Sequence, residues 1–441
     1  MKNFPTVSTY QVLKNRKSIL KNPLPFHHRN FERLGDTFKV NIGPSGAILF
    51  TRSPEYIRQV LQKQHKKYHK STLQTRDLAK YIGKGLLTSN GEHWRTHRRM
   101  VQPAFHKKKL EVLLHIMHAA IRKELERIQP SESKDMLPLM GDLAFQVVAQ
   151  SLFSRDDIQS EMEALKQIAE TNQNMLIREM RQPFMNWWFK LSGEIKRHLS
   201  YSKQARELLD TIIQERIVSA SEKDDLLDML LKARYEDGTS MSRQQLIDEL
   251  LILFTAGHET TANALSFTLF LLAKNQKQQQ KAFNSIARVD LNGSNLMETL
   301  PQLSYIKQCI EEGMRLYPPA YYIDRMSIKE DKFGDYTIPK DSMILLAIYE
   351  LHRDATFWEA PEEFQPERFD PSVKKDFQEY YYPFGAGPRM CVGNNFAMYE
   401  MILVVAEILK KYELNAVTKE VEINPLITLK PKEVILKFAP R

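Results

Sequence analysis

The densest group of chemically useful residues surrounds Cys391. Gly385, Gly387 and Gly393 flank this cysteine in the run FGAGPRMCVG, directly before a segment with helical periodicity. Glycines at this density let a backbone wrap around a sulfur and point N–H groups at it. A thiolate at a helix N-terminus beside Arg389 is also stabilised as an anion. The pattern predicts a cysteine that ligates a metal or acts as a nucleophile.

A second group lies in the long apolar segment 246–272. Ala256 and Gly257 precede Thr260 by four and three residues, so the three share one face of a predicted helix. A small residue leaves room over a flat ligand, and the threonine hydroxyl can loosen the helical hydrogen bonds. Glu259 places a carboxylate in the core, where acids are paired or move protons.

Spacing excludes other kinds of site. Gly385-x-Gly387 would need a glycine at position 390 for a dinucleotide fingerprint, but Met390 is there. His258-Glu259 begins like a zinc-protease motif, which requires a histidine where the chain has Ala262. With only two cysteines, the chain has neither a disulfide framework nor a four-cysteine zinc site, and the sequence leaves open a single bridge between Cys309 and Cys391.

Five separated motifs carry a resemblance to a known family. In order they are Trp94-x-x-x-Arg98, Ala256-Gly257-His258-Glu259-Thr260, Glu312-x-x-Arg315, Phe364-x-Pro366-Glu367-Arg368-Phe369 and the Cys391 loop. Together they cover almost the whole chain, which resembles a soluble bacterial cytochrome P-450, a haem-thiolate monooxygenase. The resemblance implies haem b with Cys391 as axial iron ligand. It also implies a mainly α fold with small β-sheets, a triangular helical prism whose long central helix lies over the haem.

The resemblance further implies roles for individual residues. Glu259 and Thr260 would be catalytic and deliver the protons that split dioxygen at the iron. The residues implied to surround the haem, besides Cys391, are Trp94, Arg98, Arg389, Arg325, Phe384, Ala256 and Gly257. The residues implied to line the substrate pocket are Ala320, Tyr322, Ile323, Arg178 and Trp187.

A structural ion-pair network is expected from three residues. Glu312 and Arg315 stand one helical turn apart, and Arg368 can complete a bidentate network with them. This network fixes the fold and does no chemistry. Breaking it would leave buried charge unpaired.

The pattern of elements is that of one haem domain over residues 1–441, with a β-rich N-terminal lobe of about 1–65 packed on an α-rich lobe. The segment 38–50 predicts two short strands and 427–438 a hairpin. Helical periodicity and caps predict helices over 54–64, 107–129, 136–153, 157–178, 195–220, 223–235, 303–316 and 395–411, with the longest helix beginning after Ser242. About 50 residues follow Cys391, so we expect no fused reductase.

Composition and charge limit the kinds of partner that the chain is expected to have. The chain has 441 residues, 42% hydrophobic and 27% charged, and 63 basic minus 54 acidic residues give +9. So mild an excess does not indicate a nucleic-acid partner. Positive charges interrupt the first 20 residues, so we expect no membrane segment there and a soluble, cytoplasmic protein. The stretch 93–110 has no acidic residue and is either a solvated helix face or a dock for an anionic group or an acidic protein, and we expect an acidic ferredoxin to bind there.

The oxidant and electron source follow from the resemblance. Members that use peroxide directly carry Arg-Pro in place of Glu259-Thr260, so this chain is expected to use O2. Its two electrons would come from NAD(P)H through a ferredoxin reductase and a ferredoxin. A haem-based sensor or carrier without turnover is the alternative outside enzymes, and it would have no use for a proton relay.

The substrate is the least determined property. Arg178 and Trp187 lie near further aromatic and cationic residues, which suits a methoxylated sugar stacked on an aromatic ring. A weaker resemblance to marine bacterial demethylases of 6-O-methyl-galactose points the same way, to O-demethylation with release of formaldehyde. The alternatives are hydroxylation of a fatty acid, terpenoid or steroid, or tryptophans that merely pack between helices.

Overall fold

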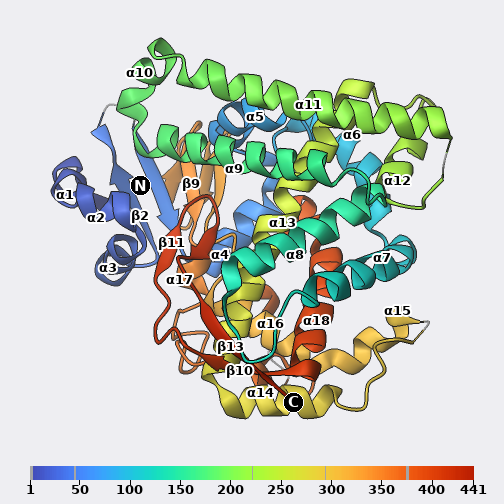
Figure 1. Cartoon of the computed structure of the whole chain (residues 1–441). Helices are drawn as coiled ribbons and strands as arrows, with labels where there is room; N and C mark the ends of the chain where they lie inside the picture. Colours follow the sequence, from blue (N-terminus) through green and yellow to red (C-terminus); the bar gives the residue numbers. More distant parts are fainter. Residues whose placement is uncertain (1–2, 44–45, 221, 294, 374–376) are drawn as a thin grey trace.

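The molecule is built around one long buried helix, α13 (Arg243–Lys274) (Figure 1). The computed structural model describes residues 3–43, 46–220, 222–293, 295–373 and 377–441. The Ser242 hydroxyl accepts a hydrogen bond from the Gln245 N–H at 3.2 Å and caps the helix, as predicted. Since α13 has 32 residues, it spans about 48 Å and crosses the core.

The other described helices pack around α13 or cover the sheets. The first half of the chain contributes α1 (Thr9–Lys14), α2 (Arg16–Lys21), α3 (Leu24–Leu34), α4 (Pro54–Arg58), α5 (Ala79–Ile82), α6 (Gly91–Val101), α7 (Lys107–Leu125), α8 (Met136–Phe153), α9 (Gln159–Arg181), α10 (Asn186–Leu191) and α11 (Glu194–Ser219). The second half contributes α12 (Leu226–Lys232), α14 (Gln276–Ile286), α15 (Leu296–Thr299), α16 (Ser304–Leu316), α17 (Ile348–Leu351) and α18 (Asn394–Lys411).

Helix α8 is long and apolar enough to cross a membrane, and 67% of it is buried inside the molecule. It packs against α13, where a Cβ on Gly257 would lie 3.0 Å from Val148 Cγ2. Burial against α13 accounts for the apolar character of α8, as for any helix that is hydrophobic on every side.

Four small sheets complete the fold. The largest has the strand order β1 (Thr6–Val7), β2 (Thr37–Asn41), β3 (Ala47–Thr51), β9 (Met343–Leu346), β6 (Ile323–Ser327) and β4 (Tyr68–His69). A three-stranded sheet joins β10 (Tyr412–Ala416), β13 (Ile435–Pro440) and β5 (Ser133–Asp135). The two-stranded sheets pair β11 (Ile423–Pro425) with β12 (Leu429–Pro431) and β7 (Asp331–Phe333) with β8 (Tyr336–Ile338). The predicted fold class, mainly α with small sheets, is confirmed.

Two expectations about the ends of the chain were wrong. The N-terminal lobe is not simply β-rich, because α1, α2 and α3 occupy much of it, and its sheet is completed by β9, which pairs in parallel with β3. The expected single hairpin at 427–438 is divided between two sheets, since β12 pairs with β11 and β13 with β10. The pairs β3–β9 and β10–β13 join strands that are distant in sequence and leave no local pattern, whereas β11 and β12 form a short hairpin just before the predicted one.

Candidate active site

The loop before α18 has a tightly folded backbone and presents Cys391 as an exposed free thiol. The Cys391 N–H donates to the Phe384 carbonyl at 3.0 Å. Gly385 and Gly387 both have a φ of +70°, in the left-handed region that favours glycine. At Gly387 a Cβ would also lie 2.0 Å from the Leu61 carbonyl oxygen, in the turn that follows α4. The loop therefore reaches this turn only without a side chain at position 387.

The charge that acts on Cys391 comes from Arg98 on α6. Desolvation raises the pKa of the thiol, while the Gly393 N–H and the positive charge of Arg98 lower it. Arg98 Nη1 donates at 2.8 Å to the carbonyl of the residue before the cysteine. The sequence placed Arg389 in this role, but its Cζ instead lies 4.4 Å from the centre of the Trp94 ring. Arg98 is thus the cation that acts on the sulfur, and the role of Arg389 as a haem contact stays a prediction.

Three cations gather next to this loop: Lys70, Arg325 and Arg389. Lys70 and Arg325 are buried and Arg389 is half-buried. Burial and the charge of Arg325 lower the pKa of Arg389 to about 10, and burial with both arginines lowers that of Lys70. None of the three has a carboxylate at ion-pair distance among the described residues, although Asp324 offsets part of the charge of Arg325. Buried unpaired cations fit an anionic ligand such as the two carboxylates of haem.

Sequence reasoning missed Lys70. Its Nζ donates to the carbonyls of Leu86 and Leu87 at 2.6 and 2.7 Å, which fixes the ammonium group in place. Lys70 follows β4, and the antiparallel pairing of β4 with β6 brings it towards Arg325. Strand β4 has only two residues, so no periodic pattern could have revealed this pairing.

On α13, Ala256 is exposed and Thr260 lies one turn further along. The Thr260 hydroxyl donates to the Ala256 carbonyl at 2.9 Å. Gly257 has a different environment, because a side chain there would press on Val148 of α8. The close approach of α8 and α13 thus explains the glycine, and Ala256 is the small residue on the open side.

Both carboxylate oxygens of Glu259 accept hydrogen bonds. Gln173 Nε2 on α9 and Thr428 Oγ1 between β11 and β12 each donate at 2.5 Å. Asn263 Nδ2, one turn along α13, donates to the same threonine oxygen at 3.1 Å. The acid is half-buried and joins three elements, so it can take part in proton movement only if it exchanges one of these partners.

The predicted charge network joins α16 to the segment 352–368. Glu312 and Arg315 are fully buried, and two hydrogen bonds of 2.7 and 2.9 Å join them. Arg368 Nε adds one hydrogen bond to Glu312 at 3.3 Å, so Arg315 and not Arg368 supplies the bidentate contact. Arg315 also donates to the His352 carbonyl at 2.8 Å, and the Gln365 N–H donates to Glu312 at 2.9 Å. The network fastens the segment that leads to the Cys391 loop.

The structure separates the residues predicted for the substrate pocket. Ile323 lies beside the Cys391 loop, near Gly385, and Ala320 is half-buried with no polar contact. Tyr322 instead forms a hydrogen bond of 2.9 Å with His27 in the N-terminal core. Arg178 pairs with Glu194 at 2.6 Å, and the side chain of Trp187 is 64% exposed.

Helix geometry explains the error on α9. Gln173 of this helix reaches Glu259, and Arg178 follows five residues later, about 140° around the helix axis. Arg178 and Trp187 therefore do not converge on the face of α13 that carries Ala256. The expected aromatic and cationic pocket at 178–188 was wrong.

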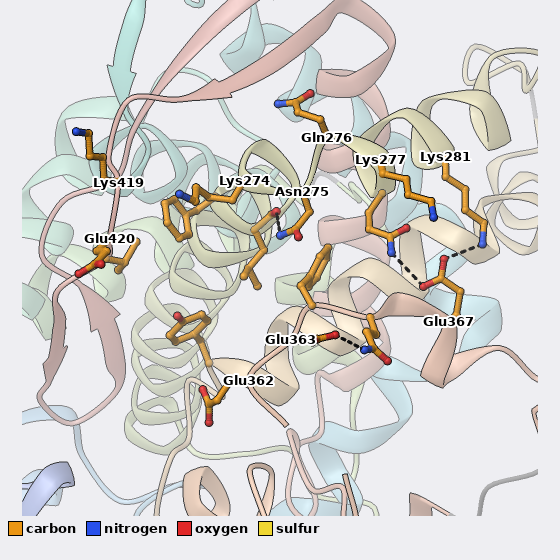
Figure 2. Close-up of a pocket in the computed structure, with 17 residues that line it drawn as sticks. Lys274, Asn275, Gln276, Lys277, Lys281, Glu362, Glu363, Glu367, Lys419 and Glu420 are labelled. Carbon is orange, nitrogen blue, oxygen red and sulfur yellow. Dashed lines mark hydrogen bonds and ion pairs between the residues drawn. The ribbon is translucent and has the colours of Figure 1, made fainter. Parts of the chain in front are cut away.

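A separate cavity of about 1040 Å³ lies at the C-terminal end of α13 (Figure 2). Charged residues of both signs line it, among them Lys274, Lys277, Glu362 and Glu420, and Lys281 is paired with Glu367 at 2.8 Å. None of the candidate haem or substrate residues is part of its wall. This cavity is distinct from the Cys391 site.

Comparison with known proteins identifies the family. The cytochrome P-450 family profile matches residues 4–438. Cyclooctat-9-en-7-ol 5-monooxygenase of Streptomyces melanosporofaciens is 29% identical over 92% of this chain and 88% of its own length. The 11-oxo-beta-amyrin 30-oxidase of Glycyrrhiza uralensis is 30% identical over 92% and 80%, and the taurochenodeoxycholic 6 alpha-hydroxylase of Sus scrofa 30% identical over 83% and 77%. With the Cys391 loop and its neighbouring cations, these matches establish that the chain belongs to the cytochrome P-450 monooxygenases, a family that carries a haem iron.

Proposed function

We propose that Cys391 would ligate the iron of haem b and that Lys70, Arg325, Arg389 and Trp94 would hold its propionates. The observation that carries this assignment is the group of two buried cations, Lys70 and Arg325, and the half-buried Arg389 next to the cysteine loop, for which the described residues supply no carboxylate at ion-pair distance. When bound, haem supplies an iron that activates O2 with two electrons. Arg98, which donates to the carbonyl next to Cys391, fixes the loop and adds positive charge beside the sulfur.

Glu259 and Thr260 are proposed to supply protons at the face of α13. The Thr260 hydroxyl donates its hydrogen bond to the Ala256 carbonyl and can rotate to donate to another acceptor. Glu259 can replace that proton after it has taken up a proton from solvent and given up Thr428 as partner, while Gln173 keeps the carboxyl group in position. A haem sensor or carrier would not need this relay, so product formation separates the two functions.

The electrons are proposed to come from a separate ferredoxin and its NAD(P)H-dependent reductase. Within the basic stretch 93–110, Arg95 pairs with Glu92 and Arg99 with Glu236, which leaves the exposed Lys107, Lys108 and Lys109 for an acidic partner. Three adjacent lysines can speed the encounter with an acidic protein. The free thiols of Cys309 and Cys391 suit the reducing cytoplasm, where we place the enzyme.

The substrate is proposed to be an apolar ring system of the terpenoid or steroid class. Relatives named for such substrates span most of this chain at 29–30% identity. The methoxylated-sugar hypothesis depended on Arg178 and Trp187 facing the pocket, and this support is lost. O-demethylation of 6-O-methyl-galactose remains a prediction without structural support, and fatty-acid hydroxylation an alternative.

The experiment is carbon monoxide difference spectroscopy of the reduced protein followed by turnover. Cys391→Ser should lose the thiolate spectrum, and the matched control Cys309→Ser, at a buried thiol on α16, should keep it. Soret-band titrations then compare a triterpenoid, a bile acid, a fatty acid and 6-O-methyl-galactose. A shift with the sugar alone would contradict the proposed substrate class, and binding without product under NADPH with surrogate partners would favour a sensor.

A further inference from the structure

The cavity at the C-terminal end of α13 has an apolar floor (Figure 2). Phe270 and Leu271 of α13 and Phe364 of the segment after α17 are only 6–8% exposed and belong to the main hydrophobic core. Tyr317, after α16, and Val421, between β10 and β11, pack against the same core at the cavity wall. The cavity therefore reaches from the surface into the core, and about 1040 Å³ is enough for a ring system or a short apolar chain.

The acidic residues on the rim of this cavity are mostly paired. The pairs are Lys281 with Glu367 at 2.8 Å, Gln365 with Glu363 at 2.5 Å and Arg353 with Glu362 at 3.4 Å. Glu420 is the remaining acid of the wall, and the described residues supply no partner for it. The rim therefore offers one free carboxylate.

Three lysines of the rim have no acidic partner. Lys274 at the end of α13, Lys277 in the first turn of α14 and Lys419 in the loop after β10 are exposed. No carboxylate of the part of the chain that the structure describes lies at ion-pair distance from any of them. Figure 2 shows Lys274 and Lys419 on the side of the cavity away from the Lys281–Glu367 pair. With three unpaired cations against the unpaired Glu420, the rim favours a negatively charged ligand.

We propose that this cavity binds a small amphipathic anion, an apolar ring or chain that carries one negatively charged group. The apolar body lies against Phe270, Leu271 and Phe364, and the charged group lies at Lys274 and Lys419. Lysines on an open surface hold an anion weakly because water screens their charge, whereas an apolar floor adds the burial of the body of the ligand. This site is separate from the proposed haem and substrate sites, which share no residue with its wall.

One wall of the cavity also belongs to the buried charge network. The Glu363 carbonyl accepts a hydrogen bond from Arg315 Nη2 at 3.1 Å, and the Gln365 N–H donates to Glu312 at 2.9 Å. A ligand that binds only the folded chain stabilises the arrangement of the segments that it contacts. Because this ligand contacts α13 and the segment 362–367 together, its binding stabilises the network that leads to the Cys391 loop.

The test is isothermal titration calorimetry of the haem-loaded full chain with 2-naphthoate and with its neutral analogue 2-naphthalenemethanol. We expect 2-naphthoate to bind more tightly than the alcohol, and its affinity to fall at least about tenfold in Lys274→Ala/Lys419→Ala. Lys329→Ala/Lys340→Ala is the matched control, because both lysines are exposed and neither lines the cavity. Val421→Trp should fill the cavity and prevent binding of either compound.

Two further readouts locate the bound anion. The Soret band should stay unchanged during the titration, and saturating 2-naphthoate should raise the midpoint of thermal unfolding of the native chain but not of Lys274→Ala/Lys419→Ala. Absence of binding, equal affinity for the neutral alcohol or native affinity in the lysine variant would overturn the proposal. A Soret shift that follows the calorimetric titration would also overturn it, because the anion would then occupy the haem pocket.

Discussion

The Cys391 side and the Glu259 side of the candidate site are held in different ways. Around Cys391 the fixed atoms belong to the backbone: Cys391 donates to Phe384, seven residues earlier, and Gly387 lies against the Leu61 carbonyl. Around Glu259 the contacts are hydrogen bonds between side chains, and its partners Gln173 and Thr428 are 86 and 169 residues away in sequence.

This difference indicates which side can move. A backbone loop whose glycines exclude any side chain has one arrangement, because every alternative would clash or strain. Hydrogen bonds between side chains can be exchanged for others at a cost of about 1 kcal/mol each. We therefore expect the Cys391 side to be rigid and the Glu259 side to rearrange as substrates enter.

The strongest test of the rigid side is Glu312→Gln. It removes the negative charge that faces the buried Arg315 and Arg368, and we expect the free energy of unfolding to fall by about 4 kcal/mol. Urea unfolding followed by circular dichroism measures this change. The control is Glu236→Gln, whose carboxylate is 87% exposed and pairs with Arg99, and it should cost less than about 1 kcal/mol. Equal effects of the two variants would show that the Glu312 network does not hold the loop.

A comparison of Gly387→Ala with Gly385→Ala separates the cost of backbone strain from the cost of a steric clash. Both glycines have a φ of +70°, so either alanine costs about 1–2 kcal/mol. At Gly385 the new methyl group would have 3.6 Å to Ile323, but at Gly387 it would meet a carbonyl oxygen at 2.0 Å. We expect Gly387→Ala to lose about 3 kcal/mol and most of its bound haem, measured as haem absorbance per protein. Similar haem content in the two variants would contradict the tight packing of the loop on Leu61.

The same division explains what the sequence could predict. The Cys391 loop, the Glu312–Arg315 pair and α13 are local patterns of glycine spacing, helical turn and periodicity, and they appear where the sequence places them. Lys70, Gln173 and Thr428 were missed because each reaches its position through a pairing distant in sequence. The same cause misplaced Tyr322 and Arg178, whose residue types suit a pocket but whose backbone directions only the tertiary structure fixes.

The pH dependence of stability tests the contact between α13 and the turn that holds Lys70. Glu249 of α13 accepts the Leu86 N–H at 3.0 Å, in the turn whose carbonyls hold Lys70. Burial raises the pKa of Glu249 to about 7 from 4.5, so between these pH values the unfolded chain ionises first and stability falls as pH rises. The neighbouring His97, 3.8 Å away, has a pKa lowered to about 4 and acts oppositely: its contribution falls as pH drops from 6.5 to 4.

Glu249→Gln should therefore leave the contribution of His97 to stability unchanged and remove the fall in stability that Glu249 causes as pH rises. Asp248, Lys70 and Gln245 also face this carboxylate and are unchanged in the variant. We expect the free energy of unfolding, measured in urea from pH 4.5 to 7, to rise relative to the native chain by up to about 1 kcal/mol per pH unit. Parallel curves for the two proteins would show that Glu249 is ionised in the folded state throughout this range.

Gln173→Ala has the smallest expected effect on stability and is the most specific test of the movable side. It removes one of the two donors to Glu259 and should cost about 1 kcal/mol while leaving the carbon monoxide spectrum unchanged. Because the freed carboxylate is no longer positioned for proton transfer, product formed per NADPH oxidised should fall by severalfold, with the difference appearing as peroxide. Gln167→Ala, at an exposed glutamine of the same helix, is the matched control and should retain native coupling. If Gln173→Ala also retained native coupling, Glu259 would act independently of α9. The hydrogen bond between Gln173 and Glu259 would then only fasten α9 to α13.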